Sequence, residues 1–173
     1  MLQKFQNHTQ QNFSFLKEKK LLVAVSGGMD SMLLVDLFQK LKFDFTLAHC
    51  NFQLRGTESD GDENFVVTYA KQNDITCFVA KFDTEKYSKA HKLSTQVTAR
   101  NLRYNWFNEI LEQEKFDYIV TAHHADDVVE TFMINLSRGT GLDGLTGIPS
   151  QNGNIIRPML PFSRKEIEEY VSE

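Results

Sequence analysis

The fold is decided by one stretch of the sequence, LLVAVSGGMDS at residues 21–31. Its first five residues form a continuous apolar run rich in valine, which is typical of a strand buried on both faces. Gly27 and Gly28 then predict a tight turn, because neither residue has a side chain that restricts the backbone. The apolar residues from Met29 to Leu41 recur at helical spacing. The first unit is therefore a strand, a glycine turn and a helix.

The same alternation continues along the chain. We expect further strands at residues 43–50, 75–82, 118–122 and 155–158, and further helices at 58–71, 95–114, 126–136 and from 164 onward. We expect Phe65 and Val97 on the inner faces of their helices. Strands that alternate with helices predict an α/β fold, with a parallel five-stranded sheet covered by helices on both faces. Ligands of such sheets bind at the carboxyl ends of the strands, near a switch in strand order.

The length of 173 residues suits one domain. We divide the chain into an N-terminal tail or short helix, residues 1–12, and one domain over residues 13–173. The last helical pattern reaches Glu173 without a glycine or proline that would end it. A truncated helix and a natural C-terminal helix explain this equally well.

Composition limits the classes of partner. There are 19 Lys and Arg residues against 23 Asp and Glu residues, so any contact with RNA needs a local patch or a segment outside this sequence. Cys50 and Cys77 are the only cysteines and form no CxxC motif, which argues against a zinc site or a redox pair and for a reducing cytoplasm. We expect both to be small buried thiols. No apolar run approaches the roughly 20 residues that span a bilayer, so we expect no membrane partner.

The glycine turn predicts an anion site. Amide groups in the first turn of a helix have no intrahelical partners and lie at the positive end of the helix dipole. Ser26 and Ser31 add hydroxyl groups, so the turn suits a pyrophosphate-like group. Neither the GxxxxGK[ST] loop nor the GxGxxG fingerprint is present. A carboxylate such as Asp30 repels phosphate unless it binds a cation, which implies Mg²⁺; the alternative is a plain turn in which Asp30 only interacts with the dipole.

A second group of candidate residues follows the expected strand at 118–122. Asp127 and Glu130 lie three residues apart on a predicted helix, so they share a face and can bind Mg²⁺ next to phosphates. The alternative is that these acids only favour the helix N-terminus. His123 can hydrogen-bond a phosphate or orient the site. Arg100 and Arg103 share a face of another helix, where one can cover the core and the other can pair with phosphate or substrate.

Several ordered motifs resemble one family. SGGMDS at 26–31 resembles the signature of the PP-loop (N-type) ATP pyrophosphatases. Residues 49–59 resemble the HxNxxLRxxES element of the tRNA(Ile)-lysidine synthetase family, and residues 123–142 resemble its HHxDDxxET and RGTGLxGL elements. ARNLRY at 99–104 and RPML at 157–160 also fit. The resemblance implies an adenine nucleotide alpha hydrolase-like (Rossmann-like) fold.

The resemblance also assigns roles to individual residues. The catalytic residues it implies are Asp30, Arg100, His123, Asp127 and Glu130, of which Asp30, Asp127 and Glu130 would bind the metal. The nucleotide-binding residues it implies are Ser26, Gly27, Gly28, Asp30, Ser31, His49 and Asn51. The substrate-binding residues it implies are Arg55, Glu58, Arg103 and Arg138. Glu58 would receive the amine of lysine, whereas Arg138 can instead form a surface ion pair.

The reaction implied by the resemblance uses ATP and Mg²⁺. The wobble cytidine of a tRNA(Ile) with a CAU anticodon is adenylated, and free L-lysine then displaces AMP to form lysidine. The glycines at 139, 141, 144 and 147 would form a mobile or tightly turned loop over the site. Two alternatives are a tRNA thiolase of the same superfamily and a non-catalytic module that binds ATP or AMP. The oligomeric state stays open, with a homodimer as one option.

Overall fold

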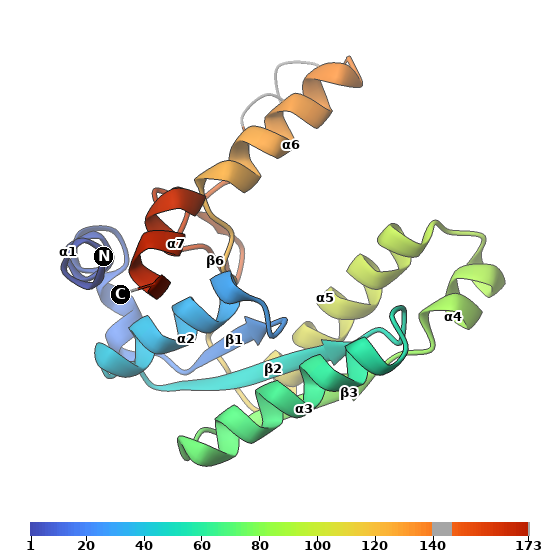
Figure 1. Cartoon of the computed structure of the whole chain (residues 1–173), viewed down its shortest axis with the longest axis horizontal. Coiled ribbons are helices and arrows are strands. Elements are labelled where there is room, and N and C mark those ends of the chain that lie inside the picture. The colour runs from blue at the N-terminus through green and yellow to red at the C-terminus, as the bar shows by residue number, and fades with distance from the viewer. Residues whose placement is uncertain (140–146, 173) are drawn as a thin grey trace.

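The computed structural model describes residues 1–139 and 147–172. Its helices are α1 (Leu2–Asn12), the 3-10 helix η1 (Ser14–Glu18), α2 (Met29–Lys40), α3 (Thr57–Gln72), α4 (Thr84–His91), α5 (Thr95–Gln113), α6 (Ala125–Ser137) and α7 (Arg164–Ser172). Its strands are β1 (Leu21–Val25), β2 (Phe45–Asn51), β3 (Cys77–Lys81), β4 (Tyr118–Val120), β5 (Gln151–Asn152) and β6 (Ile155–Ile156). Figure 1 shows their arrangement.

The strands form one sheet in the order β3-β2-β1-β4-β6-β5. All neighbouring pairs are parallel except β5 and β6. The chain runs outward from β1 to β2 and β3, then returns to the other side of β1 with β4. The strand order therefore switches between β1 and β4, where the helices that follow these two strands diverge and leave room for a ligand.

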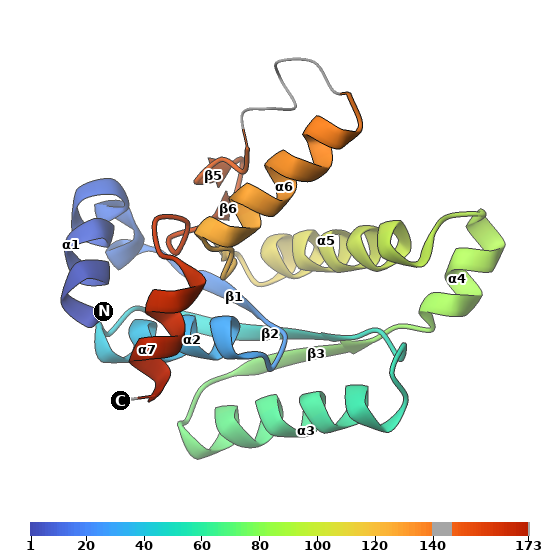
Figure 2. The same cartoon turned by 45° about the horizontal axis from the view of Figure 1, so that its top comes forward.

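The sheet is covered on both faces, as the sequence predicts. Leu21, Val23 and Val25 point into the larger core cluster, which contains residues of α1, α2, α3 and α7. Leu22 points the other way and packs with Phe107 and Ile110 of α5. The alternation arises because successive side chains of a strand point to opposite faces. Figure 2 shows α3 and α5 on opposite sides of the strands.

The sheet has six strands, so the prediction of five was wrong by one edge strand. The missed strand β5 pairs antiparallel with β6 through a two-residue loop, Gly153 and Asn154. Gly153 has φ +55°. A Gly-Asn pair between two short strands is a known hairpin sequence. Without this Gly-Asn pair, a strand of two residues cannot be recognised, because it is too short to show an alternating hydrophobic pattern.

Two apolar residues that were expected on inner faces are exposed. Phe65 on α3 is 51% exposed and Val97 on α5 is 44% exposed. Val97 lies in the first turn of α5, which with α4 extends beyond the ends of β2 and β3 (Figure 2). Helical spacing identified the helices but did not show how much of each helix the sheet covers.

Helix α6 also projects away from the sheet (Figure 1). None of its residues is buried. Its exposed large apolar side chains are Val129, Phe132, Met133, Ile134 and Leu136. Among the helices of the described ranges, 1–139 and 147–172, none is long and apolar enough to cross a bilayer.

Helix α1 packs on the same core as the sheet. Phe5 has no exposed surface, and its ring centroid lies 6.2 Å from that of Phe38 and 5.8 Å from that of Phe162. Phe38 belongs to α2 and Phe162 directly precedes the capping residue of α7. The N-terminal helix therefore joins two elements that flank the glycine turn.

We predict that Phe5→Ala lowers the free energy of unfolding by about 3–5 kcal/mol, because it leaves a cavity in the core. Urea unfolding followed by circular dichroism measures this change. Gln10→Ala, on the exposed side of the same helix, is the control and should change stability by no more than about 0.5 kcal/mol. Equal effects of the two substitutions would show that α1 does not pack on the core.

Candidate active site

A cavity of about 520 Å³ opens at the switch in strand order. It is lined by the ends of β1, β2 and β4, by the first turn of α2 and by α5. The sequence predicts most of the candidate site residues at these same strand ends. Of the predicted site residues, the cavity is lined by Ser26, Asp30, Ser31, His49, Asn51, Arg55, Arg103, His123 and Asp127.

The glycine turn has the geometry of an anion site. Gly27 has φ +90°, and a Cβ atom there would lie 3.5 Å from the Cβ of Asp62 on α3. The first helical hydrogen bond runs from the amide of Met32 to the carbonyl of Gly28, at 3.0 Å. The amides of residues 29–31 precede it and have no intrahelical partner. They are therefore available to an anionic ligand.

The two serines of the turn hold its shape. The Ser31 hydroxyl donates to the carbonyl of Gly28 at 2.9 Å and accepts from the amide of Ser26 at 3.2 Å. The Ser26 hydroxyl accepts from the amide of Gly28 at 3.2 Å. Both side chains thus stabilise the turn before a ligand arrives, in addition to the binding role predicted for them.

His49 lines the cavity, and both of its ring nitrogens can be assigned a state. Its Nδ1 lies 2.9 Å from the carbonyl oxygen of Val25, which can only accept, so Nδ1 carries the proton. Its Nε2 is buried and has no hydrogen-bond partner within residues 1–139 and 147–172. A buried nitrogen without a partner is uncommon in folded proteins. In the neutral ring with its proton on Nδ1, Nε2 is an acceptor.

Asn51 is held by the protein rather than left free. Its amide nitrogen donates to Asp60 at 2.9 Å and to Glu63 at 2.8 Å, and its oxygen accepts from the amide of Gln53 at 3.0 Å. These contacts tie the end of β2 to α3. The amide oxygen can still accept a second bond, but the main work of Asn51 in this structure is to shape the wall of the site.

Arg55 lies at the edge of the cavity and pairs with two acids. Its guanidinium donates to Glu58 at 2.8 Å and to Asp62 at 2.6 Å. Glu58 is exposed and does not line the cavity. Two of the four residues predicted to bind substrate, Arg55 and Glu58, therefore bind each other.

His123 follows β4 and faces the cavity. Its Nδ1 lies 2.8 Å from the hydroxyl of Thr121. Burial lowers the pKa of His123 below its usual 6.5; Asp127 acts against this shift, while Arg157, Arg103 and Arg100 act with it. The ring is therefore mainly neutral at pH 7.

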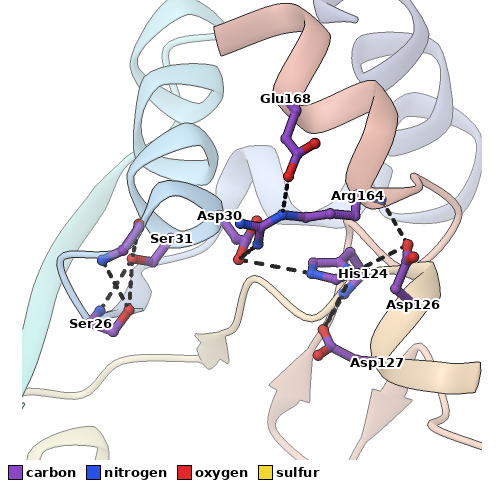
Figure 3. A network of polar contacts seen from close by, with 9 residues as sticks. Ser26, Asp30, Ser31, His124, Asp126, Asp127, Arg164 and Glu168 are labelled. Carbon is purple, nitrogen blue, oxygen red and sulfur yellow. Dashed lines mark hydrogen bonds and ion pairs between the residues drawn. The ribbon is translucent and has the colours of Figure 1, made fainter. Parts of the chain in front are cut away.

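A polar network joins the first turns of α2, α6 and α7 (Figure 3). One nitrogen of Arg164, Nη1, donates to both carboxylate oxygens of Asp30, at 2.8 and 2.7 Å. The buried ring of His124 lies between three acids, with its nitrogens 3.7–3.8 Å from Asp30, Asp126 and Asp127. The sequence did not single out Arg164 or His124. Arg164 is 134 residues from Asp30, so no local spacing connects the two.

The acids predicted to bind the metal are only partly brought together. Asp30 and Asp127 line the same cavity, whereas Glu130 is exposed, one turn further along α6, and does not line it. Over the described residues there is no group of three or more His, Cys, Asp or Glu side chains placed to bind a metal. Mg²⁺ commonly uses one or two carboxylates with phosphate oxygens and water. Asp30 and Asp127 would each supply one carboxylate to such a site, with the ring of His124 between them.

The predicted arginines occupy different places. Arg103 lines the cavity, with its guanidinium 5.2 Å from the ring centroid of Phe52. Arg100 lies 5.0 Å from the ring of Tyr104 and outside the cavity lining. Arg138 is the C-cap of α6. At 1.5 Å per residue it lies about 20 Å from the start of that helix. Of the loop predicted over the site, residues 140–146 lie outside the described residues.

Helix α4 and the start of α5 carry a basic surface that the overall composition concealed. Residues 86–108 contain none of the acids of the chain. We define the basic surface as its five cations, all of which are exposed: Lys86, Lys89, Lys92, Arg100 and Arg103. Counting charge in windows along the sequence would have found it. The surface borders the cavity through Arg103.

Neither cysteine is fully buried, contrary to the prediction, and both are free thiols. Partial burial raises the pKa of Cys50 to about 12 and that of Cys77 to about 11. Cys50 lines the cavity. At neutral pH neither thiol ionises to the thiolate, the form that acts as a nucleophile.

The comparison with known families agrees with this geometry. A family model described as a PP-loop domain matches residues 1–173. The chain belongs to the PP-loop family. The PP-loop chain is 45% identical over 159 residues to the tRNA(Ile)-lysidine synthase of Bacteroides thetaiotaomicron, covering 92% of this chain and 37% of that protein. It is 47% identical over 157 residues to the tRNA(Ile)-lysidine synthase of Chlorobaculum tepidum, covering 88% of this chain and 47% of that protein.

The PP-loop fold is also found in solved structures. The U34-tRNA thiolase NcsA of Methanococcus maripaludis, solved with its 4Fe-4S cluster, superposes with a TM-score of 0.79. The match covers 99% of this chain and 63% of NcsA at 18% sequence identity. At that identity the likeness concerns the fold alone. The chain spans less than half of the length of the two lysidine synthases, so its own activity is a matter for proposal and test.

We predict that His123 titrates below pH 6.5 in a pH series of NMR spectra of its ring protons. Arg103→Met should move the pKa upward, because it removes a positive charge that opposes protonation. Arg138→Met, at the far end of α6, should leave it unchanged. Since the folded-state pKa is depressed, His123 contributes stability above pH 6.5 that is lost as the pH falls through the folded-state pKa. A pKa at or above 6.5 would contradict the burial of this ring.

Proposed function

We propose that this PP-loop chain is the ATP-using part of a tRNA(Ile)-lysidine synthase. One observation carries the proposal: Ser26, Asp30 and Ser31 of the glycine turn line one cavity together with Asp127 at the switch in strand order. The similarity to two lysidine synthases supports the choice of reaction. A reaction on tRNA would take place in the cytoplasm.

In the proposed reaction, the turn at residues 26–31 binds the polyphosphate of ATP through the amides of its first helical turn. The helix dipole favours negative charge there. His49 Nε2 accepts a hydrogen bond from the nucleoside. Asp30 and Asp127 would hold Mg²⁺, which when bound offsets negative charge on the phosphates. Arg103 supplies a positive charge at the opposite wall of the cavity.

The chemistry has two substitutions. The C2 oxygen of the wobble cytidine attacks the α-phosphorus of ATP, and pyrophosphate leaves. The amine of free L-lysine then attacks C2 of the adenylated base, AMP leaves, and the amine loses a proton. His123 is placed to accept that proton, because its lowered pKa keeps the ring neutral at pH 7. The protein contributes mainly by positioning the reactants and stabilising charge.

The basic surface supports RNA as the substrate. Four of its five cations have no ion pair within residues 1–139 and 147–172; the exception is Lys89, which lies 3.5 Å from Glu85. Unpaired Lys and Arg side chains bind phosphates and release counterions. The surface leads to Arg103 in the cavity wall, so RNA bound on α4 and α5 can present a base to the site.

A tRNA thiolase is the competing proposal. An iron–sulfur cluster commonly uses four cysteine ligands, and this chain has two cysteines. Sulfur transfer through a cysteine needs a reactive thiolate, and burial raises the pKa of both thiols. A non-catalytic module would have no need for the acids and the neutral histidine in the cavity.

Turnover tests the proposal directly. The chain is incubated with ATP, Mg²⁺ and tRNA(Ile) transcripts with a CAU anticodon, and the release of pyrophosphate, the release of AMP and the incorporation of labelled lysine into tRNA are measured. We expect AMP release to require lysine. Sulfur incorporation would favour the thiolase, and ATP binding without any product would favour the non-catalytic module.

Two glycine variants test the role of the turn. Gly27→Ala should weaken ATP binding about tenfold or more, measured by isothermal titration calorimetry, because alanine is strained at φ +90° and distorts the turn. Gly61→Ala is the matched control, since it lies in α3 with open space around its Cβ position. It should leave binding unchanged and stabilise the helix by about 0.5–1 kcal/mol. Normal ATP binding by Gly27→Ala would exclude the turn as the phosphate site.

The role of the basic surface can be measured separately. Lys86→Glu with Lys92→Glu should weaken tRNA binding and flatten its dependence on salt, by about 0.7–0.9 in log–log slope for each lost phosphate contact. Lys42→Glu with Lys71→Glu makes the same charge change at exposed positions outside the basic surface and should have a smaller effect. Filter binding at several salt concentrations measures both. Equal losses would mean that net charge alone, and not this surface, governs binding.

A further inference from the structure

The contact between Arg164 and Asp30 is the feature of the site that the proposed reaction does not explain. Asp30 lies in the first turn of α2, beside the amides that would bind phosphate. Both of its oxygens accept hydrogen bonds from Nη1 of Arg164. The carboxylate predicted to bind a metal is therefore already occupied by a cation of the protein.

The charges around Asp30 explain why a cation is needed there. Asp126 and Asp127 lie on the other side of His124, and the phosphates of a nucleotide would add further negative charge. Like charges a few ångströms apart repel strongly where the effective dielectric constant is low. Asp30 thus needs a positive partner before the nucleotide binds. Once the nucleotide has bound with its metal, the metal can take the place of that partner.

Arg164 and a divalent cation cannot both take this position. Because Nη1 bridges the two oxygens of Asp30, it occupies the direction between them from which a metal would approach. A metal on one oxygen alone would still lie close to the guanidinium, and two cations repel each other. Binding of the metal therefore requires the guanidinium to move.

Arg164 has another partner to which it can move. Its Nε already donates to Glu168, one turn further along α7, at 2.9 Å, and its side chain is 41% exposed. The helix does not depend on the contact with Asp30. Asp126 caps it through the Arg164 amide at 2.7 Å, Tyr170 bonds to Lys40 at 3.1 Å, and Ile167 is fully buried.

We propose that Arg164 is a positioning residue that holds Asp30 in the nucleotide-free protein and gives it up to a divalent cation when the metal–nucleotide complex binds. The inference rests on the proposed function, because it takes ATP with Mg²⁺ as the ligand. It makes α7 the element that senses occupancy of the glycine turn. Arg164 then competes with the metal until it withdraws to Glu168.

Two substitutions on α7 should change metal affinity in opposite directions. In the presence of a non-hydrolysable ATP analogue, Arg164→Met should bind Mn²⁺ about fivefold more tightly, since an exposed ion pair no longer has to be broken. Glu168→Gln should bind it more weakly, because Arg164 loses the partner to which it withdraws. Lys165→Met is the matched control: it pairs with Glu169 and should change nothing. Electron paramagnetic resonance of free Mn²⁺ gives the dissociation constants.

A second measurement follows Arg164 itself. The NMR signal of its Nε–H group should shift when the analogue is added with Mg²⁺ and stay near its original position with the analogue alone. Weaker or unchanged Mn²⁺ binding by Arg164→Met, with the same thermal unfolding temperature as the wild type, would overturn the inference. Failure of the wild type to bind the analogue at all would instead contradict the proposed function.

Discussion

The rest of the structure depends on the unpaired amides at the glycine turn. The turn can exist because Gly27 takes φ +90° while α3 packs close behind it, with Asp62 and Val66 within 3.6 Å of where a side chain would begin. A strand buried on both faces brings this turn to the switch in strand order. The helix that follows then points its positive end at the cavity.

The charges around the turn follow from the same constraint. Asp30 and Asp127 bring two negative charges to the same cavity, and a nearby cation offsets such charge. Arg164 of α7 supplies that cation to Asp30. Helices from three distant parts of the sequence are thereby joined at one point (Figure 3).

Prediction from sequence succeeded where the physics is local. The strand at residues 21–25 and the turn at Gly27 are set by neighbouring residues, as is the helix that begins at Met29. The two-residue strand β5 was missed because so short a strand has no period of its own, and Phe65 was placed wrongly because its exposure depends on how far the sheet extends. The predicted roles of all the site residues stay predictions, and two of these residues, Glu130 and Arg138, do not line the cavity.

The sequence by itself determined the glycine turn, the strand and helix on either side of it and the residue types at the strand ends, because each of these follows from the chemistry of adjacent side chains. Tertiary structure alone decided that Arg164 holds Asp30 across 134 residues, that the ring of His49 donates to the carbonyl of Val25, and that the amide nitrogen of Asn51 donates to two acids of α3. Contacts of this kind depend on the crossing of separate helices and strands. The spacing of residues along the chain does not show how helices and strands cross, so these contacts can be seen only in the folded molecule.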